Sequence, residues 1–396
     1  MPKNYETYKT AIAQLPLPLA VADLDVIEKN ADELMQRAGQ LPIRIATKSL
    51  RCLPIIKHLL QYNRRFKGLM CYAAEEADYL CANGLDDILI AYPFFQLFRY
   101  EMVARRLSEG KKMTVMADHI DHFIQMQRVS DSTGIVFSVC LDIDMSTDFP
   151  GLHFGVYRSP LKSAMDVNYL LDQISGMRGF TIEGIMGYDA QIAGIGDKMA
   201  GKFLQNRFIS WLKERSKLDL HRRKGEVIDL LQRRGISLAL INAGGTGSLE
   251  FAASEGLHTE VTAGSGFYAP GLFDHYAHFN HSPAVFYALE IVRIPAPGIL
   301  TCAGGGYIAS GSVGKEKLPY PFLPAEMSLT YNEGAGEVQT PVFYKGKLSL
   351  QIGDPLFFRH SKAGEVCERF QHLYLIKGNK IIEKAPTYRG DMQCFY

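Results

Sequence analysis

The sequence lacks any apolar run that approaches the roughly 18 residues needed to cross a membrane. Residues 1–9 are polar and contain no hydrophobic segment of a secretory signal. An excess of charge is also missing, because 43 basic and 42 acidic residues leave a net charge of +1. Such a balance argues against a nucleic-acid surface. We therefore expect a protein that binds neither membranes nor nucleic acids.

Paired cysteine motifs are absent as well. The seven cysteines are scattered and none forms a CxxC pair. An odd number of cysteines without a secretory segment is typical of free thiols in a reducing compartment. We expect a cytoplasmic protein without structural disulfides.

What the sequence has is an alternation of strand-like and helix-like segments from about residue 43 to residue 263. The chain has 396 residues, of which 47% are hydrophobic, enough for one large or two medium domains. Eight short aliphatic runs are bounded by Gly, Pro or charged residues, as strands are. These predicted strands are 43–48, 68–71, 87–91, 113–117, 135–142, 180–184, 237–241 and 258–262.

Eight strands separated by helices predict an α/β fold of the (β/α)8 TIM-barrel type over residues 23–263. A doubly wound open sheet is the alternative, but the glycine loops come late rather than after the first strand. After residue 264, Gly and Pro become frequent and strand-like runs such as 287–294, 347–352 and 373–376 replace the helical pattern. We predict a C-terminal β-domain over residues 264–396, to which residues 1–22 contribute a strand.

Lys48 ends the first predicted barrel strand. The carboxyl ends of barrel strands face the active site. A lysine held there and partly desolvated can lose its proton and form a Schiff base with a carbonyl group. The alternative is a lysine that starts the next helix and points to water.

Two glycine loops follow the seventh and eighth predicted strands. The first runs from Asn242 to Ser248 and contains Gly245 and Thr246; the second is 263–266, Ala-Gly-Ser-Gly. Backbone amides without an obstructing Cβ can surround phosphate oxygens. Barrels often bind phosphate in these two loops, although glycines that only make tight turns are the alternative.

A Schiff-base lysine after strand one and a phosphate cradle after strands seven and eight lie on adjacent parts of a closed barrel. A cofactor with an aldehyde at one end and a phosphate at the other would span them. Pyridoxal 5′-phosphate (PLP) has that shape.

These motifs resemble the fold-type III PLP enzymes, the alanine racemase-like barrel family, and in particular its D-threonine aldolase and D-serine dehydratase branch. The resemblance covers most of the chain from about residue 20 and weakens after residue 300. It is carried by the run ending in Lys48, by Glu183–Tyr188 (Glu-Gly-Ile-Met-Gly-Tyr), by the loop 242–248 and by the run 260–266.

The resemblance implies roles for single residues. Lys48 would hold the cofactor aldehyde, and Tyr188 would lie near the pyridine nitrogen, unless it is a core tyrosine. His153 and Arg158 are candidates for the position near the phenolic oxygen. The phosphate would be held by five residues: Gly245, Thr246, Gly264, Ser265 and Gly266.

The branch also uses a divalent metal, held by a histidine and a cysteine or aspartate one residue apart. This sequence departs from that pattern, because His360 and Cys367 are seven residues apart. Glu365 and Cys367 have the right separation, but a glutamate would replace the histidine. Imidazole with thiolate suits Zn, and a carboxylate suits Mn or Mg. The alternative is that no metal binds and His360 or Arg359 contacts the substrate.

The activity implied is a PLP-dependent lyase acting on small D-3-hydroxy amino acids, by aldol cleavage of D-threonine-type or dehydration of D-serine-type substrates. Two alternatives also bind PLP: an amino-acid racemase, and a PLP carrier without catalysis. A third alternative, a phosphosugar-processing barrel, does not bind PLP. A racemase needs a second base, often a tyrosine from the partner subunit. The resemblance also implies a homodimer. Candidate second bases are Tyr307, Tyr320, Tyr331 and Tyr344.

Overall fold

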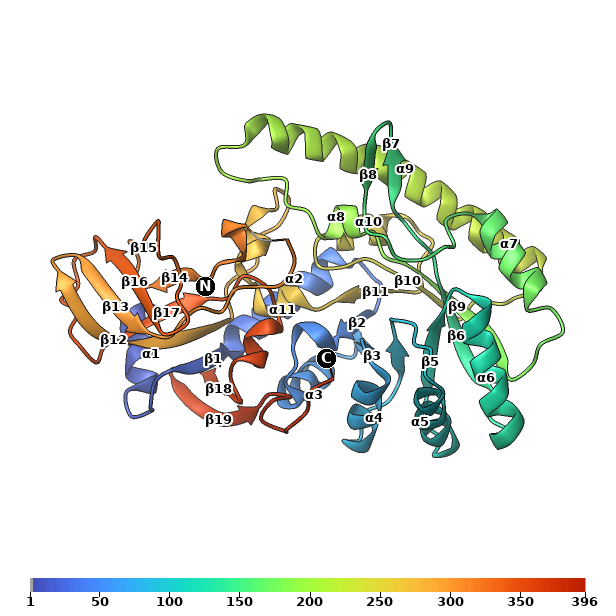
Figure 1. Ribbon diagram of the computed structural model, residues 1–396, viewed down its shortest axis with the longest axis horizontal. Helices are drawn as coiled ribbons and strands as arrows, with labels where there is room; N and C mark the ends of the chain where they lie inside the picture. Colours follow the sequence, from blue (N-terminus) through green and yellow to red (C-terminus); the bar gives the residue numbers. More distant parts are fainter. Residues whose placement is uncertain (1–2, 313, 396) are drawn as a thin grey trace.

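A computed structural model describes residues 3–312 and 314–395 and contains a closed barrel of eight parallel strands (Figure 1). Strand β11 pairs in parallel with β2, which closes the ring. This confirms the predicted TIM barrel. The barrel strands are β2 (Ile43–Ala46), β3 (Phe66–Cys71), β4 (Ile88–Ile90), β5 (Met113–Ala117), β6 (Phe137–Asp142), β9 (Phe180–Gly187), β10 (Leu240–Ala243) and β11 (Glu260–Ala263).

Helices follow these strands around the outside of the barrel (Figure 1). Local sequence sets their ends: Ser163 and Asp166 form a reciprocal capping box at the start of α7, and Gly134 ends α6 with a φ of 73°. The helices are α2 (Leu24–Arg37), α3 (Leu53–Tyr62), α4 (Ala74–Ala82), α5 (Leu97–Ser108), α6 (Ile120–Thr133), α7 (Ala164–Gln173), α8 (Ala190–Ala193), α9 (Phe203–Arg233), α10 (Leu249–Ser254) and α11 (Ser265–Tyr268).

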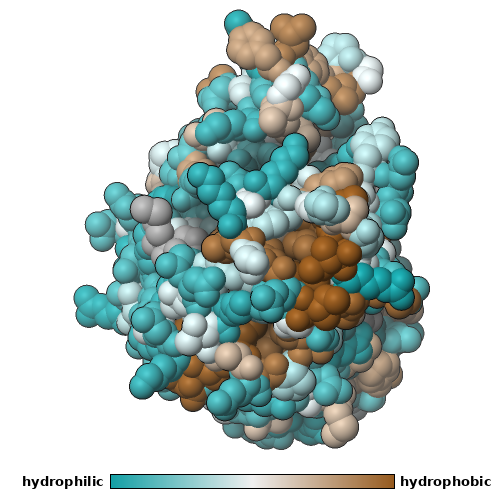
Figure 2. Space-filling model, turned by 90° about the vertical axis from the view of Figure 1, so that its left-hand side faces the viewer, coloured by the Kyte–Doolittle hydropathy of each residue, from teal (hydrophilic) through white to brown (hydrophobic). Residues whose placement is uncertain are grey.

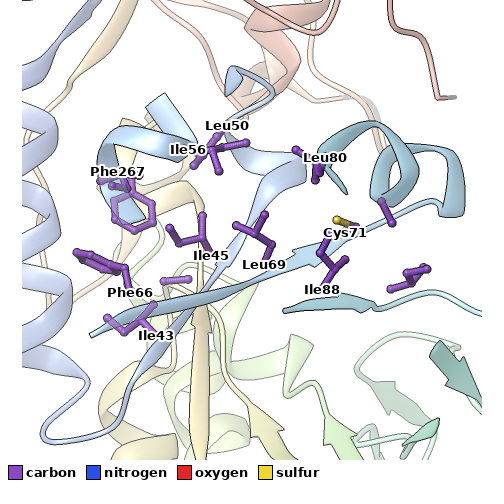
Figure 3. Packing of buried hydrophobic residues seen from close by; sticks show 14 of the residues in the cluster. Ile43, Ile45, Leu50, Ile56, Phe66, Leu69, Cys71, Leu80, Ile88 and Phe267 are labelled. Carbon is purple, nitrogen blue, oxygen red and sulfur yellow. The ribbon is translucent and has the colours of Figure 1, made fainter. Parts of the chain in front are cut away.

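The main core lies between the barrel strands and their helices (Figure 3). Alternation along β2 gives this layer Ile43 and Ile45, which pack with Leu69 from β3 and Leu80 from α4. Inside the barrel a second, smaller cluster is made by Leu89, Ala91, Met116, Cys140 and Met186. The barrel interior is therefore a filled core, and a cavity opens at its carboxyl end.

A mixed sheet of nine strands forms the other half of the molecule, on the left in Figure 1. The N-terminal strand β1 (Leu19–Asp23) lies inside it, antiparallel to β12 and parallel to β18. Helix α1 (Tyr5–Ile12) packs on the same sheet through Tyr5 and Tyr8. The remaining strands are β12 (Val285–Ala296), β13 (Ile299–Ala303), β14 (Tyr320–Leu323), β15 (Met327–Leu329), β16 (Gln339–Tyr344), β17 (Pro355–Arg359), β18 (His372–Lys377) and β19 (Lys380–Pro386).

One predicted strand, 347–352, is wrong. Its backbone is held by local side chains: Leu348 N donates to Tyr344 Oη at 2.9 Å, and Gln351 N donates to Asp354 Oδ2 at 2.9 Å. Local side-chain acceptors therefore replace a strand ladder.

A hairpin of two short strands, β7 (Thr147–Phe149) and β8 (Leu152–Phe154), stands outside the barrel beside α9 (Figure 1). None of the helices in 3–312 and 314–395 is long and apolar enough to span a bilayer.

Candidate active site

Lys48 lies on a single 3₁₀ turn, Thr47–Ser49, directly after β2 at the carboxyl end of the barrel. Thr47 Oγ1 donates to the Met70 carbonyl at 2.9 Å, which fixes the turn to β3. The Lys48 side chain is exposed to an open cavity, whereas the sequence suggested partial desolvation. Its Nζ donates to Tyr92 Oη at 2.8 Å.

The cavity has a volume of about 700 Å³ and gathers most of the predicted site residues. They come from the loops after β2, β6, β9, β10 and β11, which meet because parallel strands share one end. The predicted residues that line it are Lys48, Arg158, Tyr188, Gly245, Thr246, Gly264 and Ser265.

The two glycine loops pack so closely on their neighbours that a side chain would not fit at either glycine. A Cβ on Gly264 would lie 2.8 Å from both Ala46 O and Ser49 Cβ. A Cβ on Gly245 would lie 3.1 Å from Ala193 Cβ and 3.3 Å from Tyr188 Cε2. Such close approach of bare backbone is what an anion cradle requires.

Hydroxyl groups complete this cradle. Ser265 Oγ lies 3.3 Å from Ser49 Oγ, and Gly266 N donates to Thr246 Oγ1 at 2.9 Å. Gly266 thus lies behind the cavity and joins the two loops. Arg37 of α2 donates to Thr246 O at 2.7 Å and pairs with Glu250, so the first loop is also anchored from outside.

Tyr92 is a cavity residue that the sequence analysis missed. It follows β4, and its position directly after a barrel strand was the available signal. Burial acts to raise the pKa of Tyr92, but the Lys48 ammonium and the Arg158 guanidinium outweigh it and lower the pKa. Tyr92 is therefore a hydrogen-bonded neighbour of Lys48 in a positively charged surrounding.

Arg158 is oriented by Asp142, another residue not predicted to act there. Arg158 Nε pairs with Asp142 Oδ2 at 2.6 Å, and its NH2 donates to Ala91 O at 3.0 Å. The guanidinium lies 5.0 Å from the Tyr92 ring centre and 5.6 Å from that of Tyr188. Burial raises the pKa of Asp142 to about 6, although Arg158 opposes the rise.

Tyr188 lines the cavity beside the first glycine loop. Burial raises its pKa to about 12, so the side chain is a neutral phenol at pH 7. The next residue, Asp189, accepts a hydrogen bond from Ser248 Oγ at 2.9 Å. Tyr188 and the loop after β10 are thereby held together.

His153 does not join this group. It lies on β8, where its Nδ1 is 2.7 Å from Asp148 Oδ1 and its ring stacks on Tyr157 at 4.1 Å. Among the described residues it does not line the cavity. The hairpin β7–β8 holds His153 away from Lys48. The position of His153 in the sequence, shortly after a barrel strand, could not reveal this.

The three candidate metal ligands do not form one group: His360 and Glu365 line a common pocket, and Cys367 does not. His360 is 3% exposed and packs edge-on against Tyr268. Glu365 accepts from Ser310 N at 2.9 Å and from Ser310 Oγ at 2.5 Å, while Cys367 Sγ contacts Leu50 O at 3.2 Å. Within 3–312 and 314–395, no three His, Cys, Asp or Glu side chains are placed to hold an ion. These residues do not fit a divalent metal.

Two aldolases are among the proteins similar to this chain in sequence, and no family model matches it. The D-threonine aldolase of Arthrobacter sp is 24% identical over 329 residues, 81% of this chain and 78% of that enzyme. The 3-hydroxy-D-aspartate aldolase of Paracoccus denitrificans (strain Pd 1222) is 20% identical over 254 residues. That match spans 64% of this chain and only 60% of the relative's length.

Solved structures share the fold at low sequence identity. The D-threonine aldolase of Filomicrobium marinum has a TM-score of 0.78 at 16% identity, over 96% of both chains. A cysteine-to-alanine variant of D-threo-3-hydroxyaspartate dehydratase in its metal-free form has a TM-score of 0.72 at 16% identity, over 95% of this chain and 98% of that chain.

The alanine racemase of Clostridium difficile 630 is a further structural neighbour, with a TM-score of 0.67 at 14% identity, over 93% of this chain and 98% of that chain. The resemblance predicted from the motifs is thereby confirmed: the chain has the alanine racemase-like fold and is related in sequence to aldolases of D-3-hydroxy amino acids.

Proposed function

We propose that this protein is a PLP-dependent lyase of D-3-hydroxy amino acids. One observation carries the proposal: the Lys48 ammonium and the cradle of Gly245, Thr246, Gly264 and Ser265 line the same cavity. An amine and a candidate anion site in one cavity match the aldehyde and the phosphate of PLP. Lys48 would hold the aldehyde as a Schiff base, and the cradle would hold the phosphate.

When bound, PLP supplies an electron sink for the negative charge that develops at the substrate Cα. The protein's own residues would bind the substrate and transfer protons. Lys48 would serve as the base for that carbon, and Tyr92 would hold or return the lysine's proton through the 2.8 Å hydrogen bond between Lys48 Nζ and Tyr92 Oη. Arg158, fixed by Asp142, supplies a positive charge on the side of Tyr92 and Tyr188.

The substrate class rests on the relatives. Both sequence relatives are aldolases of D-3-hydroxy amino acids, and a dehydratase of such a substrate shares the fold. In an aldolase a base would remove the β-hydroxyl proton, and Cα–Cβ would break to release an aldehyde, whereas in a dehydratase the α-proton would be removed and the β-hydroxyl group would leave as water. Both use the same anchors on this chain.

The first test is the cofactor linkage. We expect the purified protein to show a visible absorbance that borohydride fixes to the chain, and Lys48→Ala to lose both. Lys57→Ala, a lysine on α3 outside the cavity, is the matched control. Normal absorbance and turnover in Lys48→Ala would remove the lysine from its role.

The second test separates lyase from racemase. D-serine and D-threonine are incubated with the enzyme in deuterated water. Lyase action gives an oxoacid with ammonia, or glycine with an aldehyde. Appearance of the L enantiomer alone would contradict the proposal and make the protein a racemase.

We also propose a homodimer of two-domain subunits in the cytoplasm. The division into residues 23–263 and 264–396, with 1–22 added to the second, is supported by the barrel and the separate sheet that contains β1. Figure 2 shows a hydrophobic area on one face of the molecule, as an oligomer contact would need. The six buried cysteines form no disulfide with one another, which favours a reducing compartment.

A further inference from the structure

A lysine stands where the branch pattern has its second metal ligand. In that pattern a cysteine or aspartate lies two positions after the histidine, and here the residue two positions after His360 is Lys362. One structural neighbour is a cysteine-to-alanine variant of D-threo-3-hydroxyaspartate dehydratase in its metal-free form. A protonated ammonium has three donors and no lone pair to give to a metal ion.

The other donors near this position are committed elsewhere. Glu365 is hydrogen-bonded to both the amide and the hydroxyl group of Ser310. The Cys367 thiol is fully buried against Leu50 O and lines none of the cavities described for residues 3–312 and 314–395. His360 is left as a single imidazole, and a single protein ligand does not fix a divalent ion.

Lys362 faces the proposed active site. It lines a wide open space of about 1820 Å³ that also contains Lys48, Ser49 and Tyr188. Its Nζ lies 2.9 Å from Ser310 Oγ and 3.5 Å from Glu365 Oε1, and 43% of the side chain is exposed. The ammonium is thus held in place while part of it stays free for a ligand.

The loop that carries Lys362 packs directly on the Schiff-base turn. Gly364 has a φ of +78°, and a Cβ there would overlap the carbonyl oxygen of Lys48. The loop after β17 and the turn after β2 are therefore fixed to one another. The charge of Lys362, on the loop after β17, is therefore placed relative to the amine of Lys48, on the turn after β2.

We propose that Lys362 takes the place of a metal ion in this protein: its ammonium binds a carboxylate of the substrate, and turnover requires no divalent ion. This inference rests on the proposed function. An ammonium donates charge-assisted hydrogen bonds to a carboxylate and needs no further ligands. Lys317 and Arg51 line the same space and add positive charge, with Glu316 and Glu365 opposing them.

The test measures metal and kinetics on the holoenzyme. We expect no stoichiometric metal by elemental analysis, and turnover unchanged by a chelator or by added Zn²⁺ or Mn²⁺. Lys362→Met should raise KM for the D-3-hydroxy amino acid about tenfold while kcat changes less than about threefold. The KM of Lys362→Arg should stay near that of the wild type. Lys347→Met, an exposed lysine of the same unit, should have no effect.

A stoichiometric metal whose removal stops turnover would overturn the inference, and so would an unchanged KM in Lys362→Met. Cofactor absorbance distinguishes these results from failure of the proposed function. If borohydride fixes the absorbance in both the wild type and Lys362→Met, only the role of Lys362 is contradicted. If the wild type shows no such absorbance, the assignment of PLP is contradicted as well.

Discussion

Four side chains at the mouth of the barrel form one connected group. Lys48 donates to Tyr92, the Arg158 guanidinium lies 5.0 Å from the Tyr92 ring, and Asp142 fixes Arg158. The positive charges of Lys48 and Arg158 lower the pKa of the Tyr92 phenol despite its burial. Perturbed groups of this kind concentrate at functional sites.

Replacing Tyr92 with Phe removes the hydrogen-bond partner of Lys48 and keeps the ring. We expect kcat to fall about 10- to 100-fold, because a positioned acid–base partner is lost, while cofactor absorbance remains. Steady-state kinetics and the visible spectrum check this. Tyr169→Phe, on the exposed side of α7, is the control and should be normal. Unchanged kcat in Tyr92→Phe would show that Lys48 acts alone.

Asp142 gives a pH prediction. Its pKa of about 6, raised by burial, means that the carboxylate is lost as the pH falls through 6 and Arg158 loses its partner. We expect kcat/KM of the wild type to fall on the acid side with an inflection near that pH. The kcat/KM of Asp142→Asn should be lower than that of the wild type at every pH. Its pH profile should lack the inflection, since an amide does not titrate. An identical acid limb in the variant would assign it to another group.

At the scale of elements, the site depends on how closely the ends of β2 and β11 approach. Gly264 after β11 lies against Ala46 O of β2 and Ser49 of the following turn. The strand pairing sets this distance, and the missing Cβ permits it.

Gly264→Ala should push these ends apart and weaken the anion cradle. We expect cofactor affinity to fall at least about tenfold, because one bad contact displaces several amide donors at once. Titration of apoenzyme with PLP, followed by absorbance, measures the affinity. Gly225→Ala on α9, where an added Cβ meets nothing within 4 Å, should bind normally. Equal affinities would place the phosphate elsewhere.

For the whole molecule, the C-terminal segment is tied to the barrel through α4. Tyr388 Oη donates to Glu76 Oε1 at 2.8 Å, and Tyr72 N donates to Glu76 Oε2 at 2.9 Å. Tyr388 N also donates to Arg51 O at 2.9 Å. A buried carboxyl group therefore lies at the contact between barrel and tail.

Burial raises the pKa of Glu76 from 4.5 to about 7. Between these values the folded protein keeps the proton and the unfolded chain releases it, so the free energy of unfolding falls as the pH rises from 4.5 to 7. We expect the wild type to lose about 3 kcal/mol more than Glu76→Gln between pH 5 and pH 8. Denaturant unfolding at both pH values measures this. The exposed control Glu101→Gln should follow the wild type; equal losses in wild type and Glu76→Gln would contradict the prediction.

The sequence by itself determined the barrel, Lys48 and the two glycine loops. Strand periodicity is local, and parallel topology then places every strand end on one face. Only the tertiary structure decided which side chains contact the predicted site residues. Tyr92 and Asp142 reach Lys48 and Arg158 across strands, and the β7–β8 hairpin carries His153 away. The same holds for Lys362, because packing of β17 on the sheet, rather than any local pattern, brings its loop to Lys48.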